Sequence, residues 1–190
     1  STPYPTLFPY TTLFRSIYKC EPLEQAYKNC FSQAIEEYNL KQKRADRRID
    51  GITGYMAQIR NSKNGEKLYY ETVIQIGNKF DCSVGSTKAE LAKKVLNEFM
   101  QDFSERNPNL YVFNAVLHMD EATPHLHIDY IPVAHGYQKG LQVRNSLDKA
   151  LKEQGIDGKA TKRENSTHNW QEREKDSLER IMNKYGIERA

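Results

Sequence analysis

The sequence has little cysteine and no long apolar run. Cys20, Cys30 and Cys82 form an odd set without C-x-x-C spacing, which indicates neither a disulfide framework nor a thiolate zinc site. No apolar stretch approaches the roughly 20 residues that a membrane-spanning helix needs. The N-terminus has no basic start, and three prolines among its first nine residues exclude the apolar helix of a secretory signal. Reduced thiols then fit a cytoplasmic protein without a membrane span best.

The chain also lacks a strong excess of charge of one sign. Its 190 residues carry 28 Lys and Arg against 25 Asp and Glu, a formal charge of +3, which is too mild to identify a nucleic-acid partner. Local basic clusters occur at 41–48 (KQKRADRR) and 159–163 (KATKR), where solvated helix ends are the simpler explanation. No internal repeat is present, and the length suits one domain of ordinary size with a smaller appendage.

The spacing of apolar residues predicts an α+β protein. Intervals of three and four residues predict helices over 21–43, 50–60, 87–106, 145–155 and 166–185. β-branched and aromatic residues predict strands over 67–76, 109–119 and 124–133. Thr87 and Glu90 form a capping box, and Asn107-Pro108 ends that helix. We therefore expect an antiparallel sheet flanked by helices, with a helical C-terminal extension.

The last two strands bring histidines together. If DEAT at 120–123 is the loop of a hairpin, His118 lies opposite His125, and His127 shares their face. The opposite face would be apolar and would carry Tyr111, Phe113, Ala115, Leu117, Leu126, Ile128 and Tyr130. Three imidazoles on one patch are unfavourable unless something organises them, and a divalent metal does so directly. Three histidines with open positions are typical of a catalytic metal site.

Acidic residues flank this patch. Three of them lie close enough to accept hydrogen bonds from the imidazoles and fix their tautomers: Asp120, Glu121 and Asp129. Asp129 is two residues from His127, so it shares the face of the histidines. Glu121 sits in the loop and could instead cap a turn. Such a site could serve zinc-type hydrolysis, dioxygen chemistry or phosphodiester chemistry, and the geometry alone does not choose.

The hairpin resembles a known motif. LHMDEATPHLHIDYIP contains the pattern H-x-D-E-x-x-P-H-x-H and resembles the third motif of the plasmid mobilisation and recombination relaxases, the Mob/Pre (MOBV) family. The resemblance extends through KQKRADRRI, YYETVIQIGN, FSERNPNLYVFNAV, KGLQVRNSLDKAL and NWQEREKD, and so covers nearly everything from about residue 18 onward.

This resemblance implies an HUH endonuclease that nicks and rejoins single-stranded DNA at an origin of transfer. His118, His125 and His127 match the metal ligands, and Glu121 matches the acidic residue of the motif. The metal would be Mn²⁺ or Mg²⁺ and would polarise the scissile phosphate. A protein nucleophile would leave a 5′-phosphoryl enzyme and a free 3′-OH. Basic segments would track the DNA backbone, and the candidate contacts are Arg44, Arg47, Arg48 and Arg144.

One departure from the family concerns the nucleophile, which lies in a histidine-containing segment before the first long helix. Here the first histidine of the chain is His118. Tyr18, Tyr27, Tyr38 and Tyr55 are formal candidates because other HUH enzymes use tyrosine, but periodicity makes Tyr27 and Tyr38 core residues. Residues 6–16, TLFPYTTLFRS, match the translation of a common short-read sequencing adapter.

We therefore expect residues 1–16 to be a non-native tail, 17–135 a partial relaxase core, and 136–190 a basic loop with a helical extension. The expected chain is N-terminally truncated and inactive in nicking, while it keeps its metal site. Two alternatives stay open, namely a non-catalytic single-stranded DNA-binding module and a three-histidine metallohydrolase. The sequence predicts no oligomeric state.

Overall fold

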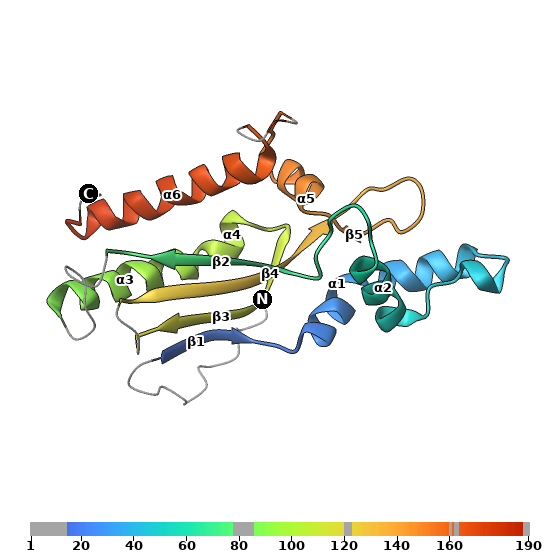
Figure 1. Ribbon diagram of the computed structural model, residues 1–190, viewed down its shortest axis with the longest axis horizontal. Helices are drawn as coiled ribbons and strands as arrows, with labels where there is room; N and C mark the ends of the chain where they lie inside the picture. Colours follow the sequence, from blue (N-terminus) through green and yellow to red (C-terminus); the bar gives the residue numbers. More distant parts are fainter. Residues whose placement is uncertain (1–14, 78–85, 120–122, 160, 162–163, 188–190) are drawn as a thin grey trace.

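Figure 1 shows the computed structural model of the chain, an antiparallel sheet packed against helices. The structure describes residues 15–77, 86–119, 123–159, 161 and 164–187. The strands are β1 (Arg15–Cys20), β2 (Tyr70–Gln75), β3 (Leu110–His118), β4 (His125–Ala134) and β5 (Arg144–Asn145). The helices are α1 (Leu23–Lys41), the 3₁₀ turn η1 (Ala45–Arg47), α2 (Gly51–Arg60), α3 (Thr87–Gln101), α4 (Phe103–Arg106), α5 (Leu147–Glu153) and α6 (Ser166–Lys184).

The sheet confirms the α+β prediction. Its strand order is β1-β3-β4-β2, with β5 paired to β4 beyond that path, and every pair is antiparallel. All eight predicted elements are present, whereas the short strands β1 and β5 were not predicted. The helix predicted over 87–106 is interrupted at Asp102, and its cap is Ser86, whose hydroxyl accepts from the Ala89 N–H at 3.1 Å. The predicted capping residue Thr87 is therefore one position too late.

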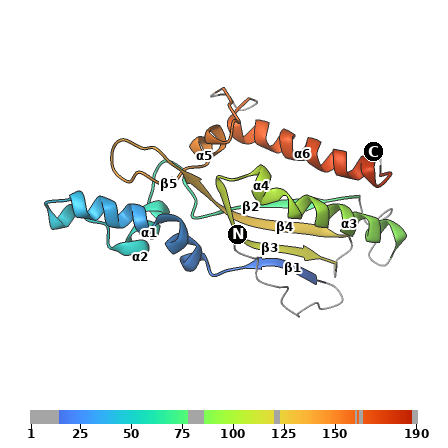
Figure 2. The same ribbon diagram turned by 180° about the vertical axis from the view of Figure 1, so that it is seen from behind.

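One face of the sheet carries the larger core. Strand β2 alternates strictly, so that Tyr70, Thr72 and Ile74 face inward toward the inward side chains of β4. Helices α3, α4 and α6 cover this face with buried side chains that include Phe99, Phe103 and Trp170. In Figure 1 these helices lie behind and above the sheet, and in Figure 2 α3 and α4 stand in front of it. Among the described residues, no helix covers the opposite face of β1–β4 over its half nearest α3 (Figures 1 and 2).

A bulge in β3 corrects the predicted faces of that strand. Pairing with β4 skips a residue between Val112 and Asn114, so Phe113 lies in the bulge. The extra residue reverses the alternation on its N-terminal side. Val112 therefore packs in the large core, while Tyr111 and Phe113 belong to the second cluster on the other side. The prediction that Tyr111 and Phe113 share the face of Leu126 is wrong for this reason.

The second cluster lies at one end of the molecule, where α1 and α2 pack together (Figure 1). It centres on Tyr27, Phe31 and Tyr55, whose rings contact one another at centroid distances of 5.2–6.3 Å. The buried side chain of Asn145 donates to the Tyr27 hydroxyl at 2.9 Å, and its backbone N–H donates to the Tyr55 hydroxyl at 2.9 Å. These bonds attach β5 to the two helices.

Strand β1 forms an edge of the sheet. It pairs with β3 from Arg15 opposite His118 to Cys20 opposite Asn114, with an irregularity between Ile17 and Lys19. The strand therefore begins inside the segment expected to be a tail, and residues 1–14 lie outside the described residues. Within the described ranges, no helix has the length and apolar character that crossing a membrane requires.

Candidate functional site

The β3–β4 hairpin gathers three histidines. His118 lies directly opposite His125, and His127 lies opposite Val116 on the same face, as the sequence predicts. The centroids of the three rings are 5.0–5.2 Å apart. His125 is buried at 8% exposure, while His118 and His127 are partly exposed. The cluster is thus placed by strand register and opens toward solvent.

Hydrogen bonds fix the tautomer of two of these rings. Nδ1 of His125 lies 3.0 Å from the carbonyl oxygen of Thr123, and Nδ1 of His127 lies 2.7 Å from Oε1 of Glu71. A carbonyl or a carboxylate oxygen accepts and does not donate, so Nδ1 carries the proton in both rings. In a neutral imidazole Nε2 then holds the lone pair, which is the form that coordinates a metal.

Glu71 is a site residue that sequence reasoning missed. It lies on β2 directly opposite Asp129, and Asp129 in turn accepts from Nδ2 of Asn114 at 2.8 Å. Asp129 lies on the same face of β4 as His127, as its position in the strand predicts. The carboxylate that accepts from His127, however, is that of Glu71. Two carboxylates directly opposite each other in a strand pair are destabilising unless cations or donors organise them. The alternation of 67–76 already placed Glu71 on the polar face, and the missing information was which strand lies beside β4.

Exposed apolar side chains surround the histidines. Ile17 is 51% exposed, Val73 50% and Tyr69 43%. Ile17 lies opposite Val116 and Val73 lies opposite His127, so both belong to the histidine face. The Tyr69 ring is held edge-on by Phe113 at a centroid distance of 5.4 Å. Exposed apolar side chains gathered on one face, with polar groups among them, are typical of a binding surface.

The donor set fits a divalent transition metal. Neutral imidazoles suit first-row transition metals, and Mn²⁺, although it also favours oxygen ligands, accepts imidazole nitrogen more readily than Mg²⁺ does. Within the described residues, no three His, Cys, Asp or Glu side chains already converge as a metal site. The predicted acidic residues Asp120 and Glu121 lie outside the described residues, so the described set is the three histidines with Glu71 and Asp129 beside them.

The candidate tyrosines lie away from the histidines. The Tyr18 hydroxyl donates to Oδ1 of Asn97 on α3 at 3.0 Å, on the covered side of the sheet. Tyr27 and Tyr55 are buried in the second cluster, and Tyr38 packs against that cluster. Burial raises the pKa of Tyr18 and of Tyr55 to about 12, which disfavours a nucleophilic phenolate. None of these four hydroxyls contacts a histidine in the described part of the chain.

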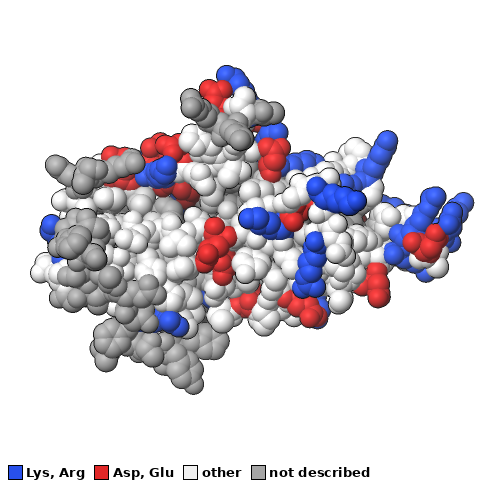
Figure 3. Space-filling view, in the orientation of Figure 1, with Lys and Arg blue, Asp and Glu red and all other residues white. Residues whose placement is uncertain are grey.

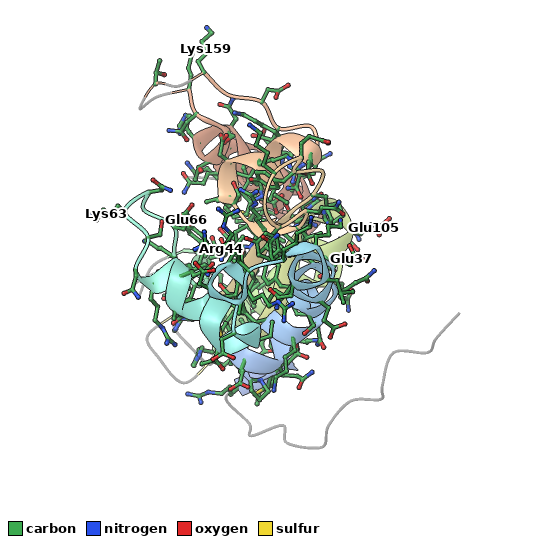
Figure 4. All side chains as sticks on the ribbon, turned by 90° about the vertical axis from the view of Figure 1, so that its right-hand side faces the viewer. Glu37, Arg44, Lys63, Glu66, Glu105 and Lys159 are labelled. Atoms are coloured by element: carbon green, nitrogen blue, oxygen red, sulfur yellow. The ribbon has the colours of Figure 1, made fainter. Side chains whose placement is uncertain are left out.

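The predicted DNA-contacting arginines divide into two groups. Arg44, Arg47 and Arg48 are exposed around η1, which lies at the opposite end of the long axis from the hairpin loop of β3 and β4 (Figure 1). Arg44, labelled in the end-on view of Figure 4, pairs with Asp46 at 2.5 Å. Arg144 lies on β5, beside the far end of β4. Figure 3 shows more basic side chains over the half of this face that holds α1, α2 and β5 than over the half with α3, although acidic groups lie among them.

The comparison with protein families gives one match. The model of the Mob/Pre family, described as plasmid recombination enzyme, matches residues 18–184. No curated protein and no solved structure matches the chain. The matched range includes every element from β2 to α6 and all three histidines of the hairpin.

Proposed function

The chain belongs to the Mob/Pre family of plasmid recombination enzymes, and we propose that it is a metal-dependent DNA relaxase domain that acts on single-stranded DNA. The proposed reaction is a transesterification at an origin of transfer. A protein nucleophile displaces the 3′-oxygen of the scissile phosphodiester, which leaves a 5′-phosphoryl enzyme and a free 3′-OH, and the reverse attack rejoins the strand. Localisation in the cytoplasm, where plasmid DNA resides, belongs to the same proposal.

The observation that carries this proposal is the histidine cluster on an open sheet face. Strand register brings His118, His125 and His127 within 5.2 Å of one another, centroid to centroid, without a helix above them. A bound Mn²⁺ would supply Lewis-acid stabilisation of charge that develops on the phosphate oxygens. His118, His125 and His127 would hold it, together with Glu121 by the resemblance of the motif.

The other residues of the site would position these metal ligands and the DNA strand. Glu71 and the Thr123 carbonyl hold the rings of His127 and His125 by accepting from Nδ1. The exposed Tyr69 offers a flat apolar surface on the same side of β2 as Glu71, and unpaired bases stack on such rings. Phosphates would therefore face the histidines while bases contact apolar side chains.

The experiment is a comparison of the wild-type chain with His127→Ala and His125→Ala. We expect the wild type to bind Mn²⁺ and single-stranded DNA, and both variants to lose metal by calorimetry while they keep the same circular dichroism spectrum. The His127 side chain is 30% exposed, so His127→Ala should disturb the fold less than His125→Ala does. If metal content, DNA affinity and any plasmid nicking are unchanged in both variants, the histidines are structural and the relaxase proposal fails.

A second candidate function is a DNA-binding module without catalysis. The observation that favours it is that the metal donors do not already converge among the described residues. This candidate predicts DNA binding that chelation with EDTA leaves unchanged. A metallohydrolase would instead turn over small phosphoesters without forming a covalent DNA adduct, so turnover of p-nitrophenyl phosphodiesters would favour that third reading.

A further inference from the structure

The loop between β4 and β5 holds an arginine in a fixed position. Arg144 pairs with Ala134 at the end of β4, and the loop is closed by the Tyr137 N–H, which donates to the Gln142 carbonyl at 3.3 Å. Strand β4 carries His125 and His127 toward its other end, so the same strand runs from this loop to the candidate metal site, although Arg144 and His127 start from opposite faces of the sheet. His127 and Ala134 are separated along β4 by about 23 Å, at about 3.3 Å per residue.

The guanidinium of Arg144 is held on three sides. Its Cζ lies 4.1 Å from the centroid of the Tyr137 ring, and its Nε donates to the Leu141 carbonyl at 2.8 Å. On the third side is Gly140, which has a φ of +73° and where an added Cβ would stand 2.8 Å from Nη2 of Arg144. The positive φ favours glycine here, and a side chain at this position would push the guanidinium of Arg144 aside. The fork of terminal nitrogens is therefore set in place before any ligand binds.

A second cation shares the same aromatic ring. Nζ of Lys149 lies 3.8 Å from the Tyr137 centroid. Its nearest carboxylate is Glu153 at 3.8 Å, and that carboxylate also accepts from the backbone N–H of His135 at 2.7 Å and from its ring at 3.0 Å. Among the described residues, no carboxylate forms an ion pair with Arg144. Two cations on one ring, with a carboxylate beside only Lys149, leave a local positive charge that an anion would stabilise.

Arg44, just before η1, differs in this respect. Arg44 is neutralised by Asp46, which accepts from its Nε at 2.9 Å and from its Nη2 at 2.5 Å. An anion at Arg44 would have to displace that carboxylate. Arg144 needs no such exchange, and its planar fork matches the geometry of a phosphate.

We propose that Arg144 and Lys149, held by Tyr137, form a binding site for one phosphodiester group of the DNA strand. This inference rests on the proposed function, because the phosphodiester belongs to the same DNA strand that is cleaved at the histidines. The contact is to the DNA backbone, several nucleotides away from the cleaved phosphodiester. It does not depend on the base sequence. It therefore contributes affinity and fixes the direction of the strand across the sheet.

The experiment measures the salt dependence of DNA binding by fluorescence anisotropy of a labelled single-stranded oligonucleotide. We expect Arg144→Gln and Lys149→Gln each to weaken binding by at least about tenfold at low salt, the equivalent of losing a charged hydrogen bond. Each phosphate contact to a single strand contributes about −0.7 to the slope of log K against log salt, so the slope becomes shallower by about that amount. Tyr137→Phe keeps the ring and the affinity, whereas Tyr137→Ala loses affinity without any change of charge.

The matched control is Lys175→Gln on α6, which makes the same charge change at an exposed lysine paired with Glu172. It should leave the DNA affinity and the salt slope as in the wild type.

If Arg144→Gln and Lys149→Gln change DNA binding no more than this control, the proposed phosphate site is wrong, while metal and DNA binding by the wild type stand. If inorganic phosphate perturbs Tyr137 in NMR spectra but the slope is unchanged in the variants, the site takes free phosphate and the DNA assignment is wrong. If the wild-type chain binds no single-stranded DNA, the proposed function fails and this site fails with it.

Discussion

At the scale of single residues, the orientation of His127 depends on a side chain from the neighbouring strand. Oε1 of Glu71 lies 2.7 Å from Nδ1 of His127, and Glu71 itself is opposite Asp129 rather than opposite the histidine. A carboxylate behind an imidazole fixes the ring and raises the basicity of the nitrogen that faces a metal. Glu71 is therefore a positioning residue, and its contribution is separable from that of the histidines.

Replacing Glu71 with Gln should weaken Mn²⁺ binding by about 10- to 100-fold, because the anionic acceptor behind His127 is lost while the shape is kept. Isothermal titration calorimetry with Mn²⁺ measures this directly. The matched control is Glu153→Gln, because Glu153 accepts from Nδ1 of His135 at 3.0 Å in an equivalent pair away from the hairpin. Equal Mn²⁺ affinities for the two variants would contradict the positioning role.

The buried tyrosines make stability depend on pH in the alkaline range. Burial raises the pKa of Tyr18 and of Tyr55 from 10.0 to about 12 in the folded chain. Because the folded pKa lies above the unfolded one, this contribution to the free energy of unfolding is complete below pH 10 and is lost as the pH rises through about 12. Urea unfolding at a series of pH values should show that fall. Tyr18→Phe should make it shallower, and a fall as steep as in the wild type would contradict the assignment of Tyr18.

At the scale of elements, the docking of α6 depends on a buried polar network around Asn107. This fully buried residue follows α4, and its Oδ1 accepts from Trp170 at 2.8 Å, from Arg173 at 2.7 Å and from Gln154 at 3.0 Å. Its Nδ2 donates to Oε1 of Glu174 at 3.2 Å. One side chain thereby joins the turn before β3 to the helix that covers the sheet.

Asn107→Ala should lower the free energy of unfolding by about 2–4 kcal/mol, because buried donors on α6 lose their acceptor and stay out of reach of water. Urea denaturation monitored by Trp170 fluorescence measures the change. Asn29→Ala is the control, since Asn29 also bonds to three side chains, those of Glu21, Gln25 and Tyr111, but is exposed. That change should cost less than about 0.5 kcal/mol. Similar costs for the two variants would show that burial of the network is unimportant.

The elements also show what the sequence could predict. Periodicity was sufficient for the hairpin, because two strands joined by a four-residue loop have one register that pairs His118 with His125. It was insufficient for the face of Tyr111 and Phe113, because the bulge at Phe113 has no sequence signal of its own. Glu71 could not be assigned for a related reason. The pairing of β2 with β4 joins residues 50 to 60 positions apart, and strand parity says nothing about which strands are neighbours.

At the scale of the whole molecule, the two ends of the sheet have different chemistry. The hairpin end carries the three imidazoles and exposed apolar side chains, and the other end carries α1, α2, η1 and the loop that holds Arg144. Figure 3, drawn in the orientation of Figure 1, shows that the basic side chains of this face lie mainly toward this second end. Arg144 lies opposite Ala134, seven residues along β4 from His127, so the two side chains start from opposite faces, and a DNA strand that contacts both would pass around the edge of the sheet. Sequence reasoning named the three histidines and Arg144 as candidates but not Glu71, Tyr137 or Lys149. It also did not give the separation of the two ends, which follows from the length and direction of β4.

The central claim is that the histidines of the hairpin bind a divalent metal. Electron spin echo envelope modulation of Mn²⁺ bound to the chain tests it most directly, because it detects imidazole nitrogen bonded to the metal. We expect nitrogen modulation for the wild type, and its reduction or loss in His125→Ala and His127→Ala chains whose circular dichroism is unchanged. Bound Mn²⁺ without nitrogen modulation, or modulation that persists when all three histidines are replaced, would contradict the assignment.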